Sequence, residues 1–208
     1  MKCHKPEFIS VKPSRKLEIP EEHAIFPDTL IDYLSGKEMP FSNRENIRQK
    51  LVKALVEEKG YQNGDISLDR EIRFDLDGRE ECSLVDLTLS VGGRTLMVFK
   101  CAAGSVVSRE RQIIATARLL EDYIIPYAVV TNGVNTELLD TVTEKVIGDG
   151  MASVPTRLEL FEKSKDLTLK PTNKRKLIYE QNVLYTYDSI GCTLYGRSQR
   201  PQLPDTGG

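Results

Sequence analysis

Apolar residues recur at helical spacing in the segment that follows Ser42. The stripe has the spacing i, i+4, i+7 and i+8 and consists of Ile47, Leu51, Ala54 and Leu55. Ser42 stands three residues before Glu45, which is the spacing of a capping box, and Gly60 is a typical stop signal. The pattern therefore predicts a helix over about 43–58.

The next segments change to the two-residue alternation of a half-buried strand. Strands are predicted at Glu71–Leu76, Leu84–Val91 and Arg94–Cys101, with Gly92-Gly93 as a hairpin turn between the last two. Pro126–Thr131 is a short apolar run between turn signals, and it predicts a buried strand.

Further helices are predicted on both sides of this last strand. The segment Val106–Tyr123 carries one apolar face, and residues 171–190 carry a weaker one. Residues 134–150 indicate a small strand pair or a strand and a turn, and one helical turn is expected near Asp28–Leu34, ended by Gly36. The order helix, three strands, helix, strand predicts an α/β fold with one mixed sheet and helices on both sides.

This reading divides the chain into four parts. Residues 1–42 form an arm that packs on the core, 43–150 form the core, and 151–196 form a C-terminal extension with a helix. The tail at 197–208 is polar and rich in Pro and Gly, and we expect it to be flexible.

Composition restricts the possible functions. The 208 residues are 39% hydrophobic and 29% charged, which is typical of a globular protein. The net charge of -2 argues against tight nucleic-acid binding over the whole surface, although it leaves room for a local basic patch. Scattered cysteines and only two histidines disfavour a zinc site or a disulfide framework. We expect no signal peptide and no membrane span, and therefore a cytoplasmic protein.

Asp86 and Lys100 are the residues that most suggest chemistry. A metal-dependent nuclease needs two or three carboxylates around a divalent cation, and a lysine that assists the attacking water. Asp86 lies on one predicted strand of a hairpin, and Lys100 ends the other strand after an apolar run. A charge in such a place suggests a partner, although a strand-end lysine often reaches water along its stem.

An ordered set of short motifs then resembles a known family. The set comprises Asn43-Arg44-Glu45-Asn46-Ile47-Arg48-Gln49, Gly60-Tyr61, Val85-Asp86, Val98-Phe99-Lys100, Gln112 and Val130-Thr131-Asn132-Gly133. Over roughly residues 43–133 it is similar to the N-terminal domain of type I restriction enzyme R subunits, which have the αβββαβ core of PD-(D/E)xK nucleases. The resemblance implies a restriction endonuclease-like fold, DNA as substrate and Mg²⁺ as cofactor. It makes Asp86 a metal ligand, Lys100 the catalytic lysine, Glu45 an acidic residue of the site and Gln112 the glutamine on the following helix.

The chain departs from this family pattern at two positions. Val98 stands where the family has the second acid, and Thr116 stands where it has a tyrosine. Either Glu45 or Glu110 replaces the missing acid, or the site is inactive. We therefore expect weak or lost metal-dependent cleavage. The alternative is a non-catalytic module that keeps the fold to bind nucleic acid or another protein.

Several of these residues also have simpler interpretations. Glu45 fits the capping box, Asp86 fits a solvated strand face, and Gln112 fits an ordinary polar helix position. Arg109 and Arg111 start a predicted helix and are candidates for phosphate contact, as is the basic run Lys174, Arg175 and Lys176. Such residues more often belong to an ordinary helix start and a solvated loop. The chain has no G-x-x-x-x-G-K-[ST] motif, so it does not carry a translocating motor.

The register of the hairpin decides whether Asp86 and Lys100 can share a site. A two-residue turn would pair Asp86 with Phe99 and turn Lys100 to the other face. A three-residue loop would pair Asp86 with Val98 and leave Lys100 on the same face. The second register also gathers Leu87, Leu89, Met97 and Phe99 on one apolar surface. We therefore predict an odd-length loop.

Overall fold

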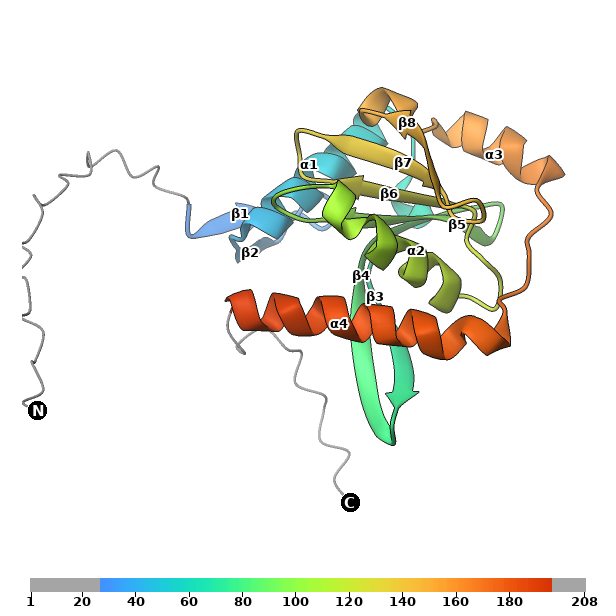
Figure 1. The fold of residues 1–208 in the computed structure, drawn as a ribbon. Coiled ribbons are helices and arrows are strands. Elements are labelled where there is room, and N and C mark those ends of the chain that lie inside the picture. Colours follow the sequence, from blue (N-terminus) through green and yellow to red (C-terminus); the bar gives the residue numbers. More distant parts are fainter. Residues whose placement is uncertain (1–26, 196–208) are drawn as a thin grey trace, which may run out of the picture.

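Figure 1 shows the chain as a mixed sheet with helices on both faces. The computed structural model describes residues 27–195, except the side chains of Lys174 and of residues 189–195. The elements in chain order are β1 (Thr29–Ile31), β2 (Glu38–Pro40), α1 (Asn43–Glu57), β3 (Ile66–Leu76), β4 (Arg79–Val91), β5 (Arg94–Cys101), α2 (Glu110–Leu119), β6 (Tyr127–Thr131), β7 (Thr136–Asp140), β8 (Lys145–Asp149), α3 (Arg157–Asp166) and α4 (Leu177–Tyr195). The succession α1-β3-β4-β5-α2-β6 has the predicted αβββαβ order.

The strands β3 to β8 form one six-stranded sheet in chain order. The β5–β6 pair is parallel, with α2 as the crossover, and every other neighbouring pair is antiparallel. The predicted mixed α/β sheet is therefore confirmed. Among the described residues, no helix combines the length and the apolar character that crossing a bilayer requires.

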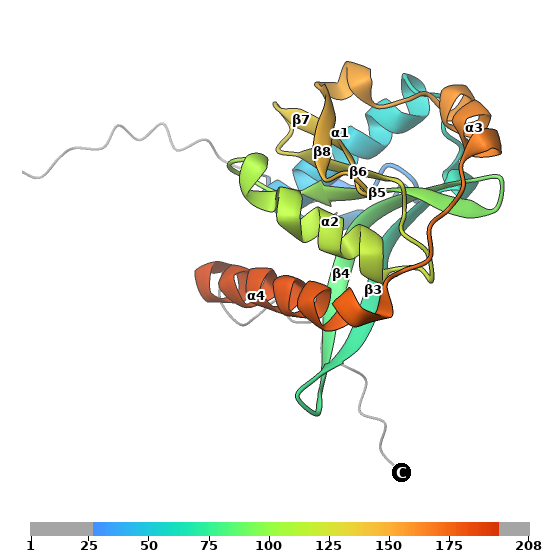
Figure 2. The same cartoon turned by 45° about the vertical axis from the view of Figure 1, so that its right-hand side comes forward.

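The helices form two layers around this sheet (Figures 1 and 2). On one face α1 and α3 pack through Leu55 and Leu160 onto a cluster that contains the predicted apolar surface of Leu87, Leu89, Met97 and Phe99. On the other face α2 and α4 pack through Ile113 and Leu184 onto a second cluster. Both clusters contain side chains with no exposed surface, so the sheet is covered on both sides.

The β4–β5 register corrects the prediction of an odd-length loop. Gly92 and Gly93, with φ values of 62° and 75°, make a two-residue turn, and Val91 pairs with Arg94. A β-bulge between Leu89 and Ser90 then shifts the register by one residue, so that Leu87 pairs with Phe99. The bulge inverts the faces beyond it, as the longer loop would, because one strand carries an extra residue. Val98 nevertheless pairs with Thr88, so the expected pairing of Asp86 with Val98 is wrong. The predicted apolar surface of Leu87, Leu89, Met97 and Phe99 therefore forms through the bulge and not through a longer loop.

The β3–β4 pair bends at Asp69 and Asp86. Asp69 has a φ of 51° and is unpaired between Leu68, which pairs with Leu87, and Arg70, which pairs with Val85. Leu87 belongs to the cluster under α1, whereas Val85 belongs to the cluster under α2 and α4. Beyond this bend the two strands run out of the sheet as a hairpin that projects past α4 (Figures 1 and 2).

Several predicted elements were wrong in type or extent. The helical turn at Asp28–Leu34 is instead the β1–β2 hairpin, whose turn Asp32 stabilises by accepting a hydrogen bond from the Ser35 N–H at 2.7 Å. The predicted helix 106–123 is a 3₁₀ turn at Val107–Arg109 followed by the shorter α2, and the last helix begins at Leu177. The helix α3 was missed, although Thr156 and Glu159 form a capping box at its start. The expected flexible tail at 197–208 lies outside the described residues.

Candidate functional site

Asp86 lies at the bend of β4, and its side chain has no exposed surface. Its Oδ1 accepts hydrogen bonds from Nε of Arg44, at 3.0 Å, and from Nη2 of the same guanidinium. Its Oδ2 accepts the backbone N–H of Cys101 at 2.6 Å, so the carboxylate terminates the β4–β5 ladder in place of a backbone carbonyl. The interpretation of Asp86 as a solvated strand residue is therefore wrong.

Lys100 meets Asp86 from the neighbouring strand. Its Nζ lies 3.4 Å from Asp86 Oδ1, and its side chain is 17% exposed. The prediction that the two residues share a face on adjacent strands is confirmed. A largely buried ammonium group needs an anionic partner, and the Asp86 carboxylate is that partner for Lys100.

The electrostatic environment keeps the Asp86 carboxylate ionised. Burial alone would raise its pKa, but the charges of Lys100 and Arg44 and the hydrogen bonds from Arg44 and Cys101 together lower the pKa below its ordinary value. A carboxylate inside a protein is stable only with such compensation.

Glu45 also lies inside, on the first turn of α1, where its carboxylate contacts other side chains. Ser42 caps the helix by accepting the Glu45 N–H at 3.0 Å, but the Glu45 side chain does not complete the predicted capping box. The Glu45 carboxylate accepts Nη2 of Arg48 at 2.7 Å and Nε2 of Gln49 at 2.8 Å. Arg48, whose side chain is 4% exposed, extends further and donates to Asp69 Oδ1 at 2.6 Å. These contacts join Glu45 to the same group of charges as Asp86.

The group is a continuous ion-pair network with balanced charge. It links three acids and three bases across α1, β3, β4 and β5: Glu45, Asp69, Asp86, Arg44, Arg48 and Lys100. Arg44, Arg48 and Asp69 were not predicted as members of the site. The signal available for the two arginines was their position beside Glu45 in a helix that packs on the sheet.

Val98 and Thr116 are the residues at which the resemblance would place an acid and a tyrosine. Val98 has no exposed surface and belongs to the apolar cluster under α2 and α4. Thr116 is buried and donates to the backbone carbonyl of Gln112 at 3.1 Å. Neither side chain supplies a charged or ionisable group near Asp86.

The donor set does not fit Mg²⁺. This ion requires several oxygen ligands and retains its own waters, but both Asp86 oxygens and the Glu45 carboxylate already accept hydrogen bonds from cationic or amide groups. Within the described part of the chain, no three His, Cys, Asp or Glu side chains are placed to share a metal ion. We therefore derive no chemical step through a metal at this site.

Gln112 faces the C-terminal helix α4. It is buried on α2, and its Nε2 donates to Asp188 Oδ1 at 3.2 Å. Asp188 was missed because it lies far away in sequence. The pKa of Asp188 is raised, mainly because the carboxyl group is buried. The charge of Asp86 raises this pKa further, whereas a hydrogen bond from Ser83 and the charge of Lys100 lower it. Asp188 is thus an additional carboxyl group in the electrostatic field of Asp86 and Lys100.

Glu110, the other candidate for the missing acid, contacts Glu137 of β7. Burial and the carboxylate of Glu110 raise the pKa of Glu137. One oxygen of Glu137 is buried without a hydrogen-bond partner in the described structure. Glu110 is therefore part of a carboxyl pair with Glu137.

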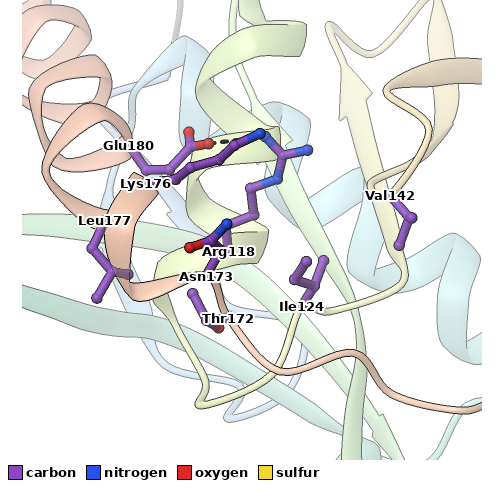
Figure 3. Close-up of a pocket in the computed structure, with 8 residues that line it drawn as sticks. All are labelled: Arg118, Ile124, Val142, Thr172, Asn173, Lys176, Leu177 and Glu180. Carbon is purple, nitrogen blue, oxygen red and sulfur yellow. Dashed lines mark hydrogen bonds and ion pairs between the residues drawn. The ribbon is translucent and has the colours of Figure 1, made fainter.

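The predicted phosphate contacts lie along α2 and at the start of α4. Arg109 and Arg111 both contact α4, whereas Arg175 and Lys176 are exposed in a 3₁₀ turn just before it; the side chain of Lys174 is outside the described set. Lys176 lines a cavity of about 200 Å³ together with Arg118 and Glu180 (Figure 3). Lys176, just before α4, and Asp188 are twelve positions apart in sequence, or about 18 Å at the rise of a helix, so the two regions are distinct.

Comparison with known proteins gives one family. The family model for the type I restriction enzyme R protein N terminus matches residues 43–155, which is slightly more than half of the chain and contains the whole αβββαβ succession. Searches of curated proteins and of solved structures found no match. The matched residues include Asp86 and Lys100, and they leave α3 and α4 outside. The chain therefore belongs to the family of type I restriction enzyme R protein N-terminal domains.

Proposed function

We propose that this protein is a restriction endonuclease-like member of its family that has lost metal-dependent DNA cleavage and keeps the fold as a DNA-binding module. The observation that carries the loss of cleavage is the state of Asp86. Its carboxylate is fully buried and accepts hydrogen bonds from Arg44, Lys100 and the Cys101 N–H. A metal ion would have to displace both cations to reach it.

The protonation state of the network supports the same proposal. A general base or metal ligand must be free to exchange partners during the reaction. Asp86 has a lowered pKa, and Lys100 is paired with that same carboxylate. Lys100 is therefore held as the counter-ion of Asp86, and no second acid at Val98 holds a metal-bound water beside it.

DNA remains the most suitable partner because the family is one of restriction enzymes and arginines follow one side of α2. Arg109, Arg111 and Arg118 lie on or next to this helix, and an arginine binds a phosphate through two parallel N–H groups. We therefore expect modest, salt-dependent binding of duplex DNA that needs no metal.

The test combines a cleavage assay, calorimetry and a binding assay on the full chain. With Mg²⁺ or Mn²⁺ we expect no cleavage of plasmid or linear duplex and no saturable heat of Mg²⁺ binding. DNA binding should be equal in Mg²⁺ and in EDTA. Metal-dependent cleavage that both Asp86→Ala and Lys100→Ala abolish would overturn the proposal, whereas cleavage unchanged in both variants would come from a contaminant.

The β3–β4 hairpin favours a second candidate, a protein-interaction module. Residues 69–82 contain six acidic and three basic residues, and this hairpin projects from the body of the protein (Figure 2). Such a surface repels DNA and suits a basic protein surface. A photo-crosslinking residue at Glu81 in cells should then give a discrete protein adduct, and the absence of any adduct would eliminate this candidate.

A further inference from the structure

The helix α4 lies along α2 and outside the residues that match the family (Figures 1 and 2). Its residues Glu180, Leu184 and Asp188 recur at every fourth position, so they lie on one face of the helix. Leu184 has no exposed surface, and the Glu180 side chain is only 2% exposed. This contact, which combines a buried carboxylate with a buried leucine, covers a surface that the matched domain would otherwise present to solvent.

Glu180 binds two arginines of α2 at once. One carboxylate oxygen accepts Nη1 of Arg118 at 2.9 Å, and the other accepts Nη2 of Arg111 (Figure 3 shows the first pair). Arg111 and Arg118 are seven residues apart and so lie on one side of α2. The Glu180 carboxylate thus bridges two guanidinium groups with its two oxygens, as the two free oxygens of a phosphodiester could.

The rest of the contact repeats this pairing of α4 with the cations of α2. The ring of Tyr179 lies 5.1 Å from the guanidinium carbon of Arg111, and the ring of Tyr187 lies 5.8 Å from that of Arg109. At the far end Asp188 accepts the hydrogen bond from Gln112. Arg111 nevertheless keeps one buried Nη1 without a partner in the described structure, so α4 does not satisfy this guanidinium completely.

We propose that α4 is a removable cover over a phosphate-binding face of α2, held in place by Glu180, which binds Arg111 and Arg118 as a nucleic-acid phosphate would. The inference rests on the proposed DNA binding and says where it occurs and what limits it. DNA and Glu180 then compete for the same guanidinium groups. The competition makes the free protein a weak binder and opens α4 when DNA is bound.

The incomplete satisfaction of Arg111 supports exchange of Glu180 for a phosphate. A phosphate offers more acceptor oxygens than a carboxylate, and a guanidinium has five N–H donors to fill. The apolar part of α4 in this interface is small: among its described residues Leu184 is fully buried and Val183 is partly buried. The two ion pairs of Glu180 are the part of the contact that another anion can replace.

The experiment compares the full-length wild type with Glu180→Gln, using anisotropy of a short labelled DNA duplex at several salt concentrations. The variant should bind more tightly at low salt because two arginines are released. Two added phosphate contacts make the log–log salt slope more negative by about 1.8, so the advantage should shrink about tenfold between roughly 50 and 200 mM salt. Glu162→Gln, an exposed acid of α3 paired with Lys165, is the matched control with the same charge change.

Adding Arg111→Gln and Arg118→Gln to the Glu180→Gln protein should remove both the gain and the extra salt slope. If wild type binds DNA and Glu180→Gln behaves like Glu162→Gln, the cover is wrong and the proposed DNA binding stands. If both proteins are folded and neither binds DNA at low salt, the DNA-binding function itself fails.

A second measurement on the wild type covers the case in which Glu180→Gln does not fold. Hydrogen exchange of the backbone amides in 177–188 should become faster when the duplex is added at low salt, because α4 is displaced. Unchanged or slower exchange in this segment, with DNA bound, would overturn the proposal.

Discussion

Replacing Asp86 with asparagine distinguishes a structural ion-pair network from a metal site. In a metal site without its ion, neighbouring carboxylates repel one another, and neutralising one of them stabilises the protein. Here Asp86 is surrounded by Arg44 and Lys100, so its loss leaves two cations without their shared anion. Asp86→Asn should therefore destabilise the fold.

The size of this effect follows from the exposure of the groups left behind. Removing one partner of a fully buried ion pair costs about 3–5 kcal/mol. The side chains of Arg44 and Lys100 are 40% and 17% exposed, so water partly replaces the lost carboxylate. The amide oxygen of asparagine still accepts one N–H. We expect a loss of about 2 kcal/mol, which lowers Tm by about 4–8 °C in a chain of this size.

Urea unfolding at several pH values measures this prediction. Because the pKa of Asp86 is lowered in the folded state, its contribution to stability is complete above the ordinary value of 3.8 and disappears as the pH falls through the folded pKa. The difference between wild type and Asp86→Asn should therefore be constant near neutral pH and close in acid. The exposed Asp166→Asn is the control. A variant as stable as wild type at pH 7 would refute the network as a structural element.

Three further predictions test other parts of the fold. Val98→Glu should lower the free energy of unfolding by at least about 3 kcal/mol, because it puts a carboxylate into an apolar cluster, and Mg²⁺ should not raise the Tm of this variant. Glu137→Gln should raise the free energy of unfolding by about 0.5 kcal/mol at pH 8, because burial and Glu110 raise the pKa of Glu137 and so disfavour its charged form. This gain should vanish as the pH falls and Glu137 of the wild type becomes protonated. Thermal melts at two pH values measure the difference. Gly148→Ala should cost about 1–3 kcal/mol in urea unfolding, because its Cβ would lie 2.5 Å from that of Ser153; an unaffected midpoint would show that this turn can move.

The succession of the central elements was predictable because periodicity and turn residues act locally. The stripe from Ile47 to Leu55 and the alternation around Phe74 and Leu89 depend only on nearby sequence, and they gave α1, β3 and β4. The β1–β2 hairpin was mistaken for a helical turn because three-residue strands are too short to show a period. The helix α3 has a capping box but a weak apolar face, since only Leu160 among its apolar residues is fully buried.

The pairing of Asp86 with Lys100 was predictable from the sequence, but the residues that surround this pair were not. Asp86 and Lys100 could be placed together because strand pairing fixes which residues share a face. The sequence contains no signal that distinguishes the bulge beside Ser90 from a longer loop. Arg44 and Asp188 reach the site from α1 and α4, and the position of a helix end over a sheet depends on packing of the whole core. Contacts of this kind are set by tertiary structure and cannot be inferred from spacing.

The charge balance around Asp86 explains how the fold can persist with valine at position 98. A carboxylate at that position would be buried in an apolar cluster and would need a metal ion or a further cation. With Val98 in place, the anion Asp86 meets the cations Lys100 and Arg44, whose combined charge equals that of a divalent metal ion. Arg44 sits in the first turn of α1, where a cation opposes the helix dipole, and Asp86 offsets this unfavourable position. Asp86, Arg44 and Lys100 thus stabilise one another directly. A domain with this arrangement should fold equally well in Mg²⁺ and in EDTA.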